Sequence, residues 1–142
     1  MGAWNYQIFC NDDTCDAMCD IMESEDLYGT LKSFLDEAIE ASDDYIEVDV
    51  AGFGLAASAV IDSIINEPAY DILFEAESSE YDEFFKKHDD KKKELDALRS
   101  DAVKVLDIIL GEESEMRELW EENEELYPLW KNTILKLKER LE

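Results

Sequence analysis

A nearly continuous apolar stretch in the middle of the chain constrains the fold more than any other feature. Residues 52–61 read Gly-Phe-Gly-Leu-Ala-Ala-Ser-Ala-Val-Ile, and the apolar character extends to Ile65. A helix that is apolar on all sides has to be buried, and its small residues let neighbouring helices approach closely. Because Asp49 and Asp62 interrupt the stretch, we expect a core helix and not a membrane span.

Amphipathic helical patterns lie on both sides of this stretch. The clearest is in residues 91–110, where apolar residues recur three or four positions apart. These residues are Leu95, Leu98, Ala102, Val105 and Ile109. Similar patterns predict helices over residues 11–23, 25–41, 114–127 and 130–141. Asn11 to Thr14 and Ser114 are typical helix starts, because their side chains can accept hydrogen bonds from free backbone N–H groups.

The predicted fold is all-α: a compact multi-helix single domain, residues 1–142, around a buried apolar central helix. A chain of 142 residues has the usual size of one domain and can build one core. A short strand is possible near residues 46–50, where Ile46, Val48 and Val50 alternate with acidic residues.

The net charge of −25 is concentrated in the first part of the chain. Residues 1–85 contain 22 acidic residues and one base, Lys32, whereas residues 86–142 contain 16 acidic and 12 basic residues. A surface this negative repels nucleic acid and anionic membranes, so we expect neither as a direct partner. It attracts cationic proteins and speeds their association. The alternative is that the acidity serves only solubility or adaptation to salt.

Acidic residues gather in two groups next to expected loops. If the protein is a binding protein, these carboxylates are the predicted partner-binding residues. The first group comprises Asp36, Glu37, Glu40, Asp43, Asp44, Glu47 and Asp49. The second group comprises Glu75, Glu77, Glu80, Asp82 and Glu83.

Catalytic and metal-binding patterns are absent from the sequence. Cys10, Cys15 and Cys19 lack a recognised zinc spacing, and the single histidine, His88, lies in a charged segment. We expect the cysteines to be small core residues, and we expect no metal or cofactor. No catalytic triad order, phosphate-binding glycine loop or nucleotide fingerprint occurs, so we do not expect an enzyme. Without a secretory signal pattern, and with an odd number of cysteines, the expected location is the cytoplasm.

Three stretches occur in order through nearly the whole chain. They are residues 1–4 with 9–16, residues 55–61 preceded by Tyr45 and Ile46, and residues 114–122 followed by Trp130 and Leu137. Together they resemble a bacterial family labelled only as domain of unknown function 4259. The resemblance implies a small helical domain and supplies no established activity. Such proteins resemble stand-alone immunity or defence-associated proteins.

These observations predict an inhibitor-type binding protein. The favoured hypothesis is an immunity protein that neutralises a basic toxin or nuclease domain by protein–protein contact, its carboxylates meeting the target's Lys and Arg. One alternative is a nucleic-acid mimic that blocks a DNA- or RNA-binding defence protein. Others are an enzyme or metal-dependent factor, and a scaffold with no charged partner.

Overall fold

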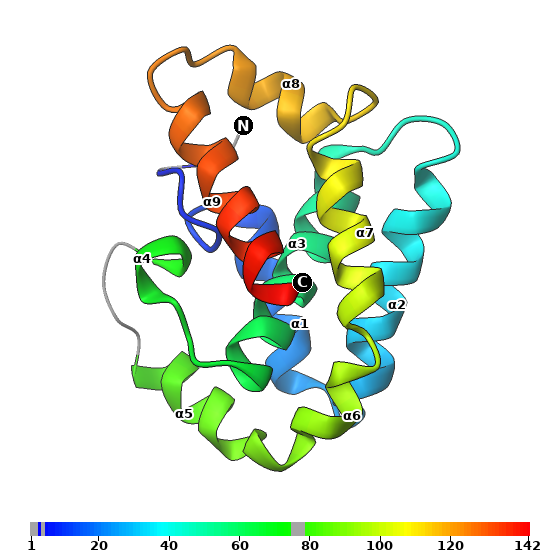
Figure 1. Ribbon diagram of the computed structural model, residues 1–142, viewed down its shortest axis with the longest axis vertical. Helices are drawn as coiled ribbons and strands as arrows, with labels where there is room; N and C mark the ends of the chain where they lie inside the picture. Colours follow the sequence, from blue (N-terminus) through cyan, green and yellow to red (C-terminus); the bar gives the residue numbers. More distant parts are fainter. Residues whose placement is uncertain (1–2, 4, 75–78) are drawn as a thin grey trace.

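The computed structural model is a bundle of helices, as the sequence predicts (Figure 1). It describes residue 3, residues 5–74 and residues 79–142. The helices are α1 (Asp12–Glu23), α2 (Leu27–Ala41), α3 (Val48–Ile65), α4 (Tyr70–Leu73), α5 (Ser79–Lys87), α6 (Lys92–Asp96), α7 (Arg99–Ile109), α8 (Glu115–Glu121) and α9 (Tyr127–Leu141), with a 3₁₀ turn at Asp89–Lys91. Trp4, Glu75 and Glu77 lie outside the described residues.

Helix α3 is the buried central helix that its composition predicts. Every residue from Gly54 to Ile64 is buried, and α1, α2 and α7 pack against the helix (Figure 1). A Cβ atom added to Gly54 would lie 2.9 Å from Val105 Cγ1 and 3.2 Å from Ala38 Cβ, so this glycine lets α2 and α7 approach closely. In the described part of the chain, α3 is also the one helix long and apolar enough to cross a bilayer, with 72% of that segment buried inside the protein.

The possible strand at residues 46–50 is replaced by a single bridge and the start of α3. Ile46 forms an isolated parallel bridge with Ser114, and the helix begins at Val48, with Ala51 N–H donating to Glu47 O at 3.0 Å. Helical hydrogen bonding prevails here because Glu115 Oε1 accepts from Val48 N–H at 2.8 Å and so satisfies a free donor of the first turn. The predicted strand is therefore wrong, although Ile46 is fully buried.

The expected helix over residues 91–110 is divided into two. Helix α6 ends at Asp96 and α7 begins at Arg99, and between them Leu98 N–H donates to Leu95 O at 2.9 Å in a tight turn. The apolar positions that predicted the helix are all buried. The apolar spacing continues across the turn because a 3₁₀-type turn repeats every three residues and an α-helix every three to four, so both bring these side chains to the same face.

Two of the three cysteines are not the core residues that the sequence predicts. The buried residues of this helix are Thr14, Ala17, Met18 and Ile21, whereas Cys15 is half-buried and Cys19 is exposed. Cys10 alone fits the expectation of a buried core thiol. Burying Ala17 and Ile21 turns the helix so that Cys15 Sγ lies 3.2 Å from Phe9 O, and burial raises the pKa of this thiol.

A buried ion pair holds the C-terminal helix against the end of α3. Asp62 is 1% exposed, and its Oδ2 accepts from Arg140 Nε at 2.7 Å, while its Oδ1 accepts from Asn66 Nδ2 at 2.7 Å. Arg140 also donates to the backbone carbonyl of Glu67. Residues 78 positions apart are thereby fixed together.

Candidate protein-binding surface

The exposed face of α2 carries the first three predicted acidic residues. Glu37 and Glu40 are exposed, and Asp36 is half-buried beside Lys32, whose Nζ lies 2.9 Å from Asp36 Oδ2. They point outward because α2 buries its opposite face against α3 through Leu27, Leu31, Leu35 and Ala38. These acidic residues border a shallow depression of about 540 Å³.

The turn from α2 to α3, together with the first turn of α3, carries the other four members of the first group. Asp43, Asp44, Glu47 and Asp49 are all exposed. The turn is held to the α7–α8 loop, because Ile46 N–H donates to Glu113 O and Glu115 N–H donates to Ile46 O, both at 3.0 Å. Its carboxylates therefore project from a fixed backbone.

This pairing brings a second acidic run to the same place. Glu112, Glu113 and Glu118 are exposed and Glu115 is half-buried. Glu118 Oε2 accepts from the hydroxyl of Tyr45 at 2.8 Å, and burial together with this bond raises the pKa of Tyr45 to about 12. We call the set Asp43, Asp44, Glu47, Asp49, Glu112, Glu113, Glu115 and Glu118 the acidic end.

The four glutamates from residues 112–118 are binding candidates that the sequence reasoning missed. They lie in the second part of the chain, where 12 bases nearly balance 16 acidic residues and the average charge hides a local acidic run. A base-free run from residue 105 to residue 116 could have marked them. Their placement beside residues 43–49 depends on the Ile46–Ser114 bridge, for which the sequence has no pattern.

Asp13 lies at the edge of the acidic end, near several of its carboxylates. Asp13 packs against Gly52, where an added Cβ would lie 2.7 Å from Asp13 Cβ. Burial raises the pKa of Asp13, and the nearby charges of Asp49, Asp16, Asp12 and Glu115 raise it further. The first turns of α1, α3 and α8 thus place the negative charges of Asp13, Asp49 and Glu115 close together.

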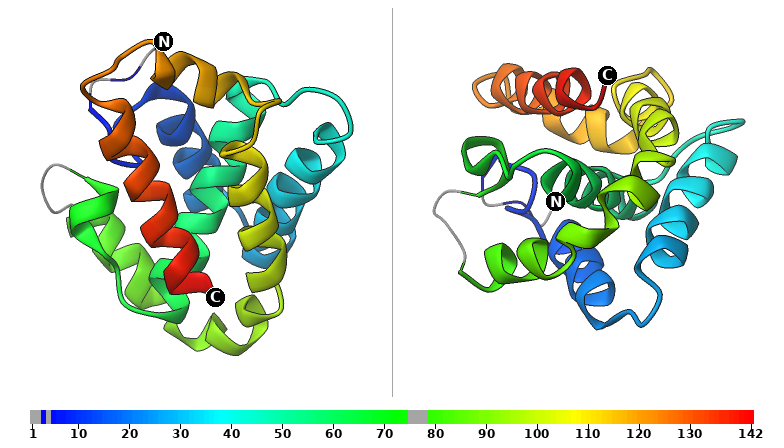
Figure 2. Two further views of the ribbon diagram at one scale, coloured as in Figure 1. Left: turned by 45° about the horizontal axis from the view of Figure 1, so that its top comes forward. Right: turned by 60° about the horizontal axis from the view of Figure 1, so that its bottom comes forward.

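The described members of the second predicted group, Glu80, Asp82 and Glu83, lie on α5. Glu80 and Glu83 are exposed on α5, whereas Asp82 is half-buried between Lys86 Nζ at 2.9 Å and the hydroxyl of Tyr70. Both bonds lower the pKa of Asp82, that of Tyr70 being the larger effect. Helix α5 and the α2–α3 turn lie at opposite ends of the molecule (Figure 2), so the described members of the second group are separate from the acidic end.

The remaining candidates for a functional site are metal-ligating side chains and the single histidine, His88. Within the described ranges, no three His, Cys, Asp or Glu side chains are arranged to hold a metal ion. The imidazole of His88 packs on Phe84, with ring centroids 4.7 Å apart, and burial followed by the charge of Lys87 lowers its pKa. The acidic end remains the strongest candidate for a functional surface.

The similarity of this chain to known proteins is at the level of a protein family. No curated protein and no solved structure matches the chain. Among protein families, DUF4259, described as a domain of unknown function, matches residues 2–133. This range includes the three stretches that carry the resemblance in the sequence, except Met1 and Leu137 at their outer ends. The chain belongs to the DUF4259 family.

Proposed function

We propose that this protein is a non-catalytic inhibitor that binds a basic protein through the acidic end, as an immunity protein binds a toxin or nuclease domain. The observation that carries the proposal is the convergence of two base-free acidic runs, residues 43–49 and 112–116, on one fixed loop pair. Carboxylates held by a rigid backbone lose little conformational entropy on binding, which favours affinity. Their summed field steers a cationic partner toward this end.

The chemistry of the partner follows from that of the surface. Asp43, Asp44, Glu112 and Glu113 are exposed, so each can accept hydrogen bonds from a partner's Lys or Arg. A nuclease presents such cations where it holds phosphate groups. Occupying them with carboxylates would block substrate binding. We therefore expect the target to be basic and its active face to be the part that is covered.

The test uses the whole chain as bait in a lysate of the source organism, with two variants of equal charge. One variant neutralises the acidic end at Asp43→Asn, Asp44→Asn, Glu112→Gln and Glu113→Gln. The matched control neutralises four exposed residues away from it, at Asp20→Asn, Glu23→Gln, Glu25→Gln and Asp90→Asn. Because all eight residues are exposed, both variants should fold.

We expect wild type and the control variant to retain a basic protein that the acidic-end variant does not retain. Raising the salt concentration should elute this protein. Co-expression with wild type should then relieve the growth defect that the captured protein causes. Equal capture by both variants would show that total charge, not this surface, attracts the partner. A captured protein whose activity is unaffected would exclude the inhibitor role.

A further inference from the structure

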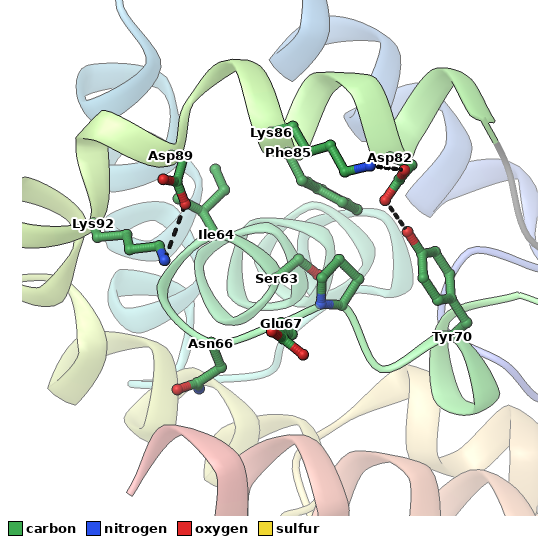
Figure 3. A pocket seen from close by; sticks show the side chains of 11 residues that line it. Ser63, Ile64, Asn66, Glu67, Tyr70, Asp82, Phe85, Lys86, Asp89 and Lys92 are labelled. Atoms are coloured by element: carbon green, nitrogen blue, oxygen red, sulfur yellow. Dashed lines mark hydrogen bonds and ion pairs between the residues drawn. The ribbon is translucent and has the colours of Figure 1, made fainter.

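A cavity lies at the carboxyl end of α3, and its lining combines apolar, acidic and basic side chains. Its volume is about 360 Å³, within the usual range of small-ligand sites. Figure 3 shows α3 nearly end-on behind Ser63 and Ile64, with α5 passing along one side and Tyr70 on another. Ile64, Pro68 and Phe85 give the cavity an apolar lining.

Helix α3 ends at this cavity, whose lining includes Ser63 and Ile64. Asp62 O accepts from Asn66 N–H at 2.8 Å, and no hydrogen bond from the described residues reaches the carbonyls of Ser63, Ile64 or Ile65. Helix carbonyls point toward the carboxyl end, where the aligned peptide dipoles are equivalent to about half a negative charge. An 18-residue helix therefore directs negative potential into the cavity.

The charged side chains of the cavity leave this negative potential uncancelled. Lys86 and Lys92 each lie 2.9 Å from a carboxylate of their own, Asp82 and Asp89. Glu67 is exposed, and its carboxylate forms no ion pair with the described residues. Arg140, which donates to Glu67 O at the same helix end, is paired with Asp62 at 2.7 Å. With these three cations paired, Glu67 and the helix-end carbonyls remain as acceptors for a positive charge.

We infer that this cavity binds an alkylammonium or alkylguanidinium group, the cationic head lying between Glu67 and the carboxyl end of α3. The alkyl stem would pack on Ile64 and Pro68, and the rings of Tyr70 and Phe85 would add cation–π attraction. The cation has two possible sources, a free amine or the Lys or Arg side chain of a protein. The inference goes beyond the proposed function, because it holds whether or not a protein partner supplies the cation.

The test is a titration of the ¹⁵N-labelled full-length protein followed by NMR. The probes are n-butylguanidinium and n-butylammonium, with butyrate and n-butanol as controls for the apolar stem alone. Saturable shifts are expected at Ile64, Asn66 and Glu67 with the two cations and not with the controls. Shifts produced equally by butanol, or spread along the acidic end without saturation, would overturn the inference.

Variants separate the cavity from the general acidity of the protein. Glu67→Gln should weaken cation binding about threefold to fivefold, the effect of losing one exposed charge pair. Glu37→Gln, an equally exposed change on α2, is the matched control and should leave the dissociation constant unchanged. Equal effects of the two changes would contradict the assignment.

A further probe distinguishes the two sources of the cation. If N-acetyl-arginine amide binds as tightly as n-butylguanidinium, the cavity admits a side chain attached to a backbone. If only the free alkyl cations bind, a small amine is the ligand. The acidic-end variant should bind both probes like wild type, so a failure here and a failure of the proposed function are independent results.

Discussion

Removing the guanidinium of Arg140 should destabilise the fold more than any other single surface charge change. Arg140→Met keeps the aliphatic stem and leaves the Asp62 carboxylate, 1% exposed, with Asn66 as its remaining donor. Breaking a buried pair by removing one partner costs about 3–5 kcal/mol. Because the Arg140 side chain is 33% exposed, water can reach part of the vacated space, and we expect about 2–3 kcal/mol.

The assay is urea unfolding followed by circular dichroism, with the free energy extrapolated to water. Lys138→Met is the control, since Lys138 Nζ lies 2.7 Å from the exposed Asp107 and such pairs are worth below about 1 kcal/mol. Adding Asp62→Asn to Arg140→Met should recover stability, because the unpaired buried charge is removed. A loss no larger than that of Lys138→Met, or no recovery in the double variant, would refute the buried-pair reasoning.

Three further predictions concern the core, the cysteines and Asp13. Gly54→Ala should lower the unfolding free energy by about 1–3 kcal/mol, because the new Cβ meets Val105 Cγ1 at 2.9 Å; an unchanged melting temperature would show that α7 yields freely. In the native protein one thiol, that of the exposed Cys19, should react quickly with Ellman's reagent, and Cys19→Ser should abolish this fast phase; its persistence would contradict the shielding of the buried Cys10 and the half-buried Cys15. The pKa of Asp13 is raised in the folded state, so its ionised form costs stability and protonation removes this cost as the pH falls through the folded pKa toward 3.8. As the pH falls from 7 to 4, the unfolding free energy of wild type should therefore rise relative to that of Asp13→Asn. If urea titrations show no such rise, the clustered charges do not raise the pKa of Asp13.

Local patterns predicted most of the helices. The stretch around Leu55 has no polar face, so its burial follows from composition alone. Asn11 and Ser114 were identified as helix starts, and each accepts from the backbone N–H three residues later, at Thr14 and Arg117. Capping and periodicity depend on neighbours in sequence, which is why these elements could be read without the structure.

Long-range pairing could not be predicted in the same way. The short alternation around Ile46 resembles a strand, and only its bridge to Ser114 and the cap from Glu115 show that a helix follows. The ion pair of Asp62 with Arg140 joins distant segments that have no shared pattern. The Ile46–Ser114 bridge, a long-range contact, also places the glutamates of residues 112–118 beside the first acidic group. The described members of the second acidic group lie on α5, away from this end.

The most direct test of the proposed role of the acidic end is the association rate of the captured partner at increasing ionic strength. Stopped-flow measurements would compare wild type, the acidic-end variant and its equal-charge control. Steering by this surface predicts that wild type and control associate at least about tenfold faster at low salt than at high salt. It also predicts a slower and flatter profile for the acidic-end variant. An association rate indifferent to salt, or three superimposable profiles, would contradict it.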